Sequence, residues 1–486
     1  MRKKLFIILI IISVLITFTI STSAEVDFTQ ELYSNLSENT NSIPYLNIPD
    51  YKSAVLYNGL KVYLFEDHSL PYIDIKGYVK GGRILENEDN AGITDFMTSV
   101  MNTGTKNYGE KELNRFKELN AVDLNLSSSD HYISFSGNAL TSEKDELISL
   151  LKEILLRPDF KAEYRSRLLA EMERNIQQSK TSQDSLLEMY FYKNIFSGHP
   201  YSYAHDLDLL IDNLDYYTPQ NLKTYYDKTV RPTKTFMIIY GDFDSSEMLK
   251  KINKEFGSWK NSSEFWKQPA VSAKSSNFGR VILINKEDAT QAKIKLGYNL
   301  NIEYFKDRMA FTLGNEVFGG GDLTTRLSKN LREEKGLVYE IYSSYVDKKT
   351  GGYYVLNTSV KPEKTYTALE SIKKEIEKIT RGKDKLTEGE IFEIVNRRNA
   401  FFPKSYSRKE DLLQSVIFNI EFKERDKNYV NKYIQAYNIL SAEDVNKYFE
   451  KYISPGRFLT VIVGKKEDIL PQFKENGISV EVVEID

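Results

Sequence analysis

The chain contains 486 residues, more than one hydrophobic core usually holds, so we expect two or more domains. It contains no cysteine, which excludes disulfides, thiolate nucleophiles, sulfur-ligated metals and lipid attachment through a thiol. Its net charge is -3, and its lysines and arginines are scattered among acidic residues, a distribution that argues against nucleic acid as a partner.

The first 24 residues have the pattern of a secretory signal peptide. Basic residues at 2–4 precede an apolar run at 5–18, and small residues at 22–24 form a cleavage site. Residues 25–40 are polar and aperiodic, which predicts a flexible leader. No second apolar stretch is long enough to span a bilayer. We therefore expect a soluble protein without a membrane anchor, exported to the periplasm or the extracellular space.

An amphipathic helix is predicted next in the first half of the chain. Apolar residues at i, i+3, i+4, i+7 and i+8 predict one core-facing side, formed by Ile93, Phe96, Met97, Val100 and Met101. The other side is polar and carries Asp95, Thr98, Ser99 and Asn102. A serine is a poor zinc ligand, and the four histidines, at 68, 131, 199 and 205, are not paired at i and i+4. This pattern favours an ordinary core helix and no metal site.

One unit of the sequence occurs twice. Residues 211–241 align without a gap with residues 434–464, at a constant offset of 223. In each copy a capping residue, Thr218 or Ser441, opens a short helix, a proline stops it, and a β-rich run follows. The order helix, stop, strand is therefore predicted in both halves of the chain.

The rest of each half of the chain indicates the fold class. Strand-like stretches open each half, and long charged helical stretches follow at 142–195 and 364–400. Irregular alternation of strands and helices predicts an α+β fold of two homologous lobes, each a mainly antiparallel sheet packed with helices. We assign the lobes to 41–262 and 278–486, with a polar linker at 263–277.

A glycine-rich string opens a distinctive segment in the second half. Phe318 is followed by three glycines and an amphipathic run that ends in Arg332 and Tyr339, seven residues apart. No Lys-Ser or Lys-Thr pair follows in register, so a phosphate-binding loop is not favoured. By residue pattern alone, Arg332 is an exposed helix charge and Tyr339 a core aromatic at a helix end.

This segment, from Phe318 to Tyr345, closely resembles the second-lobe motif of the insulinase and pitrilysin metallopeptidases, the family that includes the mitochondrial processing peptidases. Members of that family carry His-x-x-Glu-His on a first-lobe helix. The register of that helix is set here by Gly92, Phe96, Gly104 and Thr105, and it gives Asp95, Thr98 and Ser99 the His, Glu and His positions. The frame of the zinc motif is present and its ligands are replaced.

The resemblance implies that the chain forms half of a clamshell whose four lobes enclose a chamber. It implies that Arg332 and Tyr339 face a zinc ion held by a homologous partner subunit and stabilise the oxyanion of the scissile peptide bond. It also implies that Gly319, Gly320 and Gly321 form a substrate-binding hinge. No cofactor is expected in this chain, and zinc is expected in the partner.

Two functions remain open at this stage. The first is the zinc-free subunit of an exported heterodimeric peptidase, inactive alone, which acts on unfolded peptides held as an added β-strand. The second is a non-catalytic peptide-binding or scaffold protein that keeps the peptidase fold, as the core subunits of a respiratory complex do.

Overall fold

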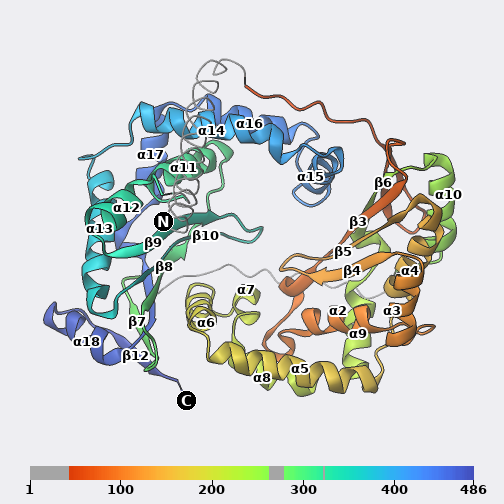
Figure 1. The fold of residues 1–486 in the computed structure, drawn as a ribbon, viewed down its shortest axis with the longest axis horizontal. Coiled ribbons are helices and arrows are strands. Elements are labelled where there is room, and N and C mark those ends of the chain that lie inside the picture. The colour runs from red at the N-terminus through yellow and green to blue at the C-terminus, as the bar shows by residue number, and fades with distance from the viewer. Residues whose placement is uncertain (1–42, 262–277, 321–322, 486) are drawn as a thin grey trace, which may run out of the picture.

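The computed structural model describes residues 43–261, 278–320 and 323–485. The expected signal peptide at 1–24, the leader at 25–40 and the linker at 263–277 lie outside the described residues. Figure 1 shows two sheets facing each other, the first at the right and the second at the left, with helices around and between them.

Each half of the chain builds one six-stranded sheet. The first has the order β1-β2-β6-β3-β5-β4, formed by Lys52–Val55, Lys61–Glu66, Thr235–Gly241, Tyr72–Lys80, Tyr132–Leu140 and Asp123–Ser128. The second has the order β12-β7-β11-β8-β10-β9, formed by Glu481–Glu484, Val281–Asn285, Leu459–Gly464, Ala292–Asn299, Tyr353–Val360 and Val338–Val346.

The two sheets share one topology. In each, a central strand contributed by the end of the repeat, β6 or β11, runs parallel to one neighbour and antiparallel to the other. The remaining inner pairs are antiparallel, and only the outermost strands differ, since β1 is antiparallel to β2 whereas β12 is parallel to β7. The predicted α+β fold with two homologous, mainly antiparallel lobes is confirmed.

Helices surround both sheets. Those of the first half are α2 Ile93–Thr103, α3 Glu110–Leu119, α4 Lys144–Leu156, α5 Ala162–Lys180, α6 Gln183–Ile195, α7 Pro200–Tyr203, α8 Leu207–Asp212, α9 Pro219–Thr229 and α10 Ser245–Phe256. Those of the second half are α11 Phe305–Phe318, α12 Arg326–Ser328, α13 Thr365–Thr380, α14 Glu388–Ser405, α15 Lys409–Glu421, α16 Tyr429–Asn438, α17 Ala442–Tyr452 and α18 Lys466–Glu475.

Local signals explain the repeated helix and strand. The hydroxyl of Thr218 accepts the N–H of Asn221 (3.2 Å) and caps α9, and the hydroxyl of Ser441 accepts the N–H of Asp444 (3.1 Å) and caps α17. The strands that follow, β6 and β11, are buried at every residue. Such continuous burial requires that both faces of each sheet are covered.

Helix α6 of the first half covers one face of the second sheet. Its apolar side chains pack among residues of β7, β10 and β11 in one core, which includes Leu187, Phe191, Ile284 and Val463. Gly297 of β8 allows this approach, because a Cβ atom there would lie 2.5 Å from the ring of Phe191. Lys293 of β8 adds an ion pair to Asp184 of α6 at 2.6 Å.

Helix α15 of the second half covers the first sheet in the reciprocal way. Its residues Leu412 and Val416 pack against Phe236 of β6 and Tyr78 of β3. At its end Glu421, 6% exposed, pairs with lysines of the first sheet. Figure 1 shows α6 and α15 between the two sheets. The lobe boundaries at 41–262 and 278–486 remain a prediction, but each half covers a sheet of the other.

No helix in the described ranges combines the length and the apolar composition that a membrane span requires.

Candidate functional site

Helix α2 carries the positions that correspond to the zinc motif, and its first turn is tightly held. Gly92 precedes it with a φ of +86°, a conformation that favours glycine. The carboxylate of Glu86, 1% exposed, accepts the N–H groups of Gly92 and Thr94, both at 2.9 Å. Burial, reinforced by the negative charge of Asp95, raises the pKa of Glu86 to about 7.

The core side predicted for α2 is confirmed, because all five of its apolar residues are buried. Thr98 is the exception to the predicted polar side, since it is only 3% exposed. Its hydroxyl donates to the carbonyl oxygen of Thr94 at 2.7 Å, which allows the side chain to lie in the core. The hydroxyl of Ser99 donates in the same way to the carbonyl of Asp95 at 3.0 Å.

The carboxylate of Asp95 is held by an arginine. Arg83 Nε lies 2.8 Å from Asp95 Oδ1 and 3.0 Å from Oδ2, and the hydroxyl of Ser128 also donates to Oδ1. Arg83 extends this contact, because its Nη1 lies 3.5 Å from Oδ1 of Asp130 in the turn between β4 and β5. The position of the first zinc-ligating histidine is therefore part of an ion-pair network.

The same network reaches the second half of the chain. Lys348, in the turn between β9 and β10, donates to Oδ2 of Asp130 at 2.5 Å. Burial alone would raise the pKa of Asp130, but the charges of Lys348 and Arg83 outweigh it and lower that pKa. Asp95, Arg83, Asp130 and Lys348 thus form one chain of alternating charge between helix α2 and the β9–β10 turn.

Zinc does not fit these residues. The family motif needs two imidazole ligands and a carboxylate base, whereas this helix offers one carboxylate already paired with Arg83 and two hydroxyls bonded to the helix backbone. Within the described ranges, no group of three or more His, Asp or Glu side chains could hold a metal ion. Neither Thr98 nor Ser99 has the chemistry of the residue it replaces.

Three histidines lie beside the β9–β10 turn and do not form a metal site. His131 Nε2 lies 2.6 Å from the hydroxyl of Tyr201, which also accepts a hydrogen bond from the Thr350 hydroxyl at 2.7 Å. His199 is fully buried, and its Nδ1 accepts the N–H of Tyr201 at 3.1 Å. Burial lowers the pKa of His131, His199 and His205 to about 4. They are neutral and structural at pH 7.

The Arg332 and Tyr339 pair lies at the surface of the second lobe. Arg332 belongs to a π-helical turn, Lys329–Glu334, and Tyr339 is the second residue of β9, the outer strand of its sheet. The guanidinium carbon lies 5.6 Å from the centre of the Tyr339 ring. Tyr339 is 75% exposed, so the interpretation as a core aromatic at a helix end is wrong. Strand β9 begins one residue before Tyr339, so this residue lies in a strand and not at a helix end.

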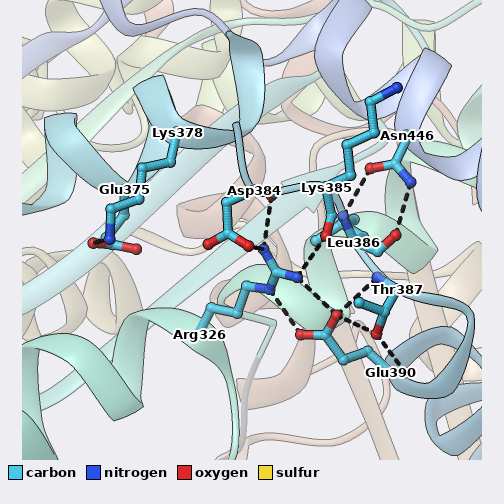
Figure 2. A network of polar contacts seen from close by, with 9 residues as sticks. All are labelled: Arg326, Glu375, Lys378, Asp384, Lys385, Leu386, Thr387, Glu390 and Asn446. Atoms are coloured by element: carbon cyan, nitrogen blue, oxygen red, sulfur yellow. Dashed lines mark hydrogen bonds and ion pairs between the residues drawn. The ribbon is translucent and has the colours of Figure 1, made fainter. Parts of the chain in front are cut away.

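Arg326 anchors the segment that precedes Arg332, and Figure 2 shows the polar contacts of Arg326. The guanidinium of Arg326 makes two bonds of 2.7 Å to the carboxylate of Glu390 and donates to the carbonyl oxygens of Asp384 and Lys385. Glu390 also accepts the N–H of Thr387 at 2.8 Å. Burial would raise the pKa of Glu390, but these hydrogen bonds outweigh it and lower the pKa to about 2. The turn before Arg332 is thereby fixed to the start of α14.

Gly319 and Gly320 end α11 in close contact with their surroundings. A Cβ atom at Gly319 would lie 2.6 Å from the hydroxyl of Ser343, and one at Gly320 would lie 2.5 Å from the Cα of Glu316. The carbonyl of Gly319 accepts the N–H of Ser343 in β9 at 2.6 Å. These two glycines have a packing role, and their assignment to substrate binding remains a prediction. Gly321 lies outside the described residues.

Sequence reasoning missed the partners of Asp95. Arg83 belongs to a Gly-Gly-Arg string, and that string was a usable signal. Asp130 and Lys348 lie in two turns with no motif around them. Their pairing depends on how the two lobes meet, so no local pattern indicates it.

Comparisons with known proteins identify the family. The model described as "Insulinase (Peptidase family M16)" matches residues 62–205, and the model described as "Peptidase M16 inactive domain" matches residues 216–397. The second match begins near the end of the first lobe and continues into the second. The chain belongs to the M16, or insulinase, peptidase family.

Similar proteins come from several bacteria. The chain is 23% identical over 317 residues to the non-peptidase homologue YmxG of Helicobacter pylori, a match that covers 64% of this chain and 72% of that protein. It is 22% identical over 427 residues to an uncharacterized zinc protease of Rickettsia felis, covering 86% and 93%. The relatives of this chain thus include one protein named as a non-peptidase and one named as a zinc protease.

Solved structures share its fold. The peptidase M16 inactive domain of Pseudomonas fluorescens has a TM-score of 0.74 at 18% identity, covering 86% of this chain and 98% of that chain. The periplasmic protease PqqL of Escherichia coli has a TM-score of 0.71 at 14% identity, covering 87% of this chain but 48% of that chain. The fold of this protein thus corresponds to about half of the PqqL chain.

Proposed function

We propose that this protein is the zinc-free subunit of an exported heterodimeric M16 peptidase and acts on unfolded peptides. Its partner is a homologous subunit with an intact His-x-x-Glu-His motif. One observation carries the proposal: Arg332 and Tyr339 lie together at the surface, with Tyr339 75% exposed, in a chain whose own zinc-motif positions hold Asp95, Thr98 and Ser99. The site has hydrogen-bond donors and lacks metal ligands.

The chemistry of Arg332 and Tyr339 fits oxyanion stabilisation. A guanidinium offers five N–H donors and a phenol one O–H donor, and both can bond a scissile carbonyl oxygen as it gains negative charge. Within the described ranges, Arg332 makes no ion pair with a carboxylate, so its donors are not already neutralised. A donor on the outer strand β9 is also accessible to an extended peptide.

The four-lobe chamber that the family resemblance implies supports the proposed heterodimer. The two lobes described here correspond to half of such a chamber, and the single chain of PqqL is about twice as long as the region it shares with this protein. The lobes of this chain would supply one half of the chamber, and the zinc-bearing subunit the other. Export is supported by the signal-peptide pattern at 1–24 and by the periplasmic location that the name of PqqL states.

The second candidate is a non-catalytic peptide-binding or scaffold protein. It is favoured by the use of Asp95 as an ion-pair partner of Arg83 and by the likeness to a non-peptidase homologue and an inactive M16 domain. In this case Arg332 and Tyr339 would contact bound peptide without taking part in its cleavage.

Reconstitution distinguishes the two candidates. The protein is co-expressed with a signal-bearing homologue from the same genome that has an intact His-x-x-Glu-His motif, and cleavage of an unfolded peptide is measured for each chain alone and for the pair. Activity that requires both chains supports the heterodimeric peptidase. A partner that is fully active alone, with kcat unchanged by this chain, would favour the scaffold.

A further inference from the structure

A pocket of about 530 Å³ lies on the outer face of the second sheet. Helix α13 covers it, and strands β7, β8 and β11, the end of α18 and the turn at Gly456 complete its lining. Figure 1 shows α13 and α18 on the side of this sheet that faces away from α6. The volume of the pocket lies within the roughly 300–1,000 Å³ that small-molecule sites occupy.

The wall of the pocket is mainly apolar. Its most deeply buried side chains, none of them more than 6% exposed, are Leu296, Ile372, Ile376, Phe458 and Phe473. A water molecule in a cavity needs two or more polar partners, which such a wall does not supply, whereas apolar molecules bind in cavities of this kind. The wall therefore favours a hydrocarbon ligand over water.

One polar side chain interrupts the apolar wall. Thr460 of β11 is 7% exposed, and its backbone N–H donates to the carbonyl oxygen of Arg280 at 2.9 Å. Its hydroxyl makes no hydrogen bond to any residue in the described ranges. Buried hydroxyl groups are normally hydrogen-bonded, so an oxygen atom of a ligand would supply the partner that this one lacks.

The repeated unit of the chain provides an internal comparison. At the offset of 223, Thr460 corresponds to Met237 of β6, which is fully buried in the core of the first lobe. A methionine side chain is longer than that of threonine and adapts to irregular gaps in a core. Because protein interiors are close-packed, the open volume distinguishes the second copy from the first and is not a general property of the fold.

The charged side chains of the lining all come from α13, and they are paired with each other. Glu370 lies 3.9 Å from Lys373, and Glu377 lies 3.1 Å from Arg381. Two carboxylates and two cations leave the lining without net charge. A charged ligand group would have to compete with these pairs or lose its hydration against the apolar wall. An uncharged ligand group avoids both costs.

We propose that this pocket binds an uncharged aliphatic molecule with one hydroxyl or carbonyl oxygen, such as a medium-chain alcohol. The hydrocarbon part lies against Leu296, Ile376 and Phe473, and the oxygen accepts a hydrogen bond from the hydroxyl of Thr460. The pocket contains none of the residues assigned to peptide hydrolysis, so this proposal does not depend on the proposed function.

Isothermal titration calorimetry tests the pocket with octanol, and with octanoate as the charged counterpart. We expect saturable binding of octanol and binding of octanoate that is about tenfold weaker or less. Thr460→Val keeps the shape of the side chain and removes its hydroxyl, so it should weaken the binding of octanol about tenfold. Thr460→Met introduces the residue of the first lobe and should abolish binding while Tm stays the same or rises.

A second pocket variant and a control complete the experiment. Leu369→Trp narrows the pocket from a partly buried position on α13 and should also abolish binding. Ile439→Ser removes an apolar side chain that is 77% exposed outside the pocket, and it should bind octanol as the unmodified protein does. The proposal is overturned if octanol does not bind saturably, if octanoate binds as tightly, or if Ile439→Ser weakens binding as much as Leu369→Trp does.

Discussion

Lys348 and Asp130 join the two halves of the chain through an ion pair of 2.5 Å. Their side chains are only 15% and 23% exposed, and Asp130 also faces Arg83, the partner of Asp95. Asp95, which occupies the position of a zinc ligand in the family motif, is thus the last residue in a series of charged contacts between the two lobes. Sequence positions 95 and 348 share no local motif, yet the fold connects them through two intermediate charges.

Breaking this contact should destabilise the protein. Lys348→Met and Asp130→Asn are each expected to lower the free energy of unfolding by about 1–3 kcal/mol, because each removes an opposite charge from beside a partly buried one. The double variant should lose less than the sum, as expected for coupled residues. Urea titration measures all three. Lys223→Met, which breaks an exposed pair to Asp227, is the control and should cost less than about 1 kcal/mol. Fully additive losses would argue against direct coupling.

His131, His199 and His205, of which His199 is buried and the other two are partly buried, predict a loss of stability in mild acid. Their pKa is lowered to about 4 from the usual 6.5, so the folded state binds fewer protons than the unfolded state between these values. Their contribution is present above about pH 6.5 and is lost as the pH falls toward 4. Urea midpoints at several pH values should fall across this window, and less steeply in His131→Gln.

His68 provides the matched control for this pH dependence. Its ring is exposed, and the carboxylate of Asp242 raises its pKa, so its contribution has the opposite sign. His68→Gln should leave the acid-induced loss undiminished. If the urea midpoint of the unmodified protein did not change between pH 6.5 and 4, the assignment of these three imidazoles as neutral in the folded protein would be contradicted.

The Arg326 network should stabilise the second lobe in a pH-dependent way. Because the pKa of Glu390 is lowered to about 2, its contribution is present above the unfolded value of 4.5 and is lost as the pH falls toward 2. Arg326→Met should lower the urea midpoint at pH 7 and reduce its change between pH 5 and 3. Arg381→Met, which breaks a more exposed pair to Glu377, should leave the urea midpoint at pH 7 and its change between pH 5 and 3 as they are in the unmodified protein.

Arg332 and Tyr339 should affect catalysis and leave folding unchanged. In the reconstituted pair, Arg332→Ala and Tyr339→Phe are each expected to lower kcat about 100-fold to 1000-fold, the usual effect of removing one oxyanion donor. Because Tyr339 is 75% exposed, Tm and the affinity between subunits should hardly change. Full activity in both variants would remove the catalytic assignment, and a parallel fall of Tm and kcat would make both residues structural.

The purified chain should bind no stoichiometric zinc and should not hydrolyse generic peptides. Asp95 is engaged by Arg83, and the hydroxyls of Thr98 and Ser99 bond the helix backbone, so neither a ligand set nor a base is present. Elemental analysis after zinc loading and desalting is the measurement. One tightly bound zinc per chain that disappears in Asp95→Ala would contradict this interpretation.

The sequence by itself determined the features that depend on near neighbours. Thr218 and Ser441 cap their helices through residues three positions ahead, and the apolar strands that follow are continuous runs, so the repeated unit could be predicted in both halves. The core side of α2 and the membership of the M16 family also follow from short patterns in fixed order. Each of these signals can be recognised within a single segment of the chain.

Only the tertiary structure decided which surfaces meet. The apolar residues of α6 and α15 can be read in the sequence, but the sequence does not show that each helix covers the sheet of the other half. The same limit applies to Arg83, Asp130 and Lys348, whose charges meet only because two turns are brought together. Tyr339 is exposed because the chain leaves the helical turn and enters an outer strand, where the local pattern indicated a helix end. Contacts between distant segments depend on the packing of whole lobes, which no single segment specifies.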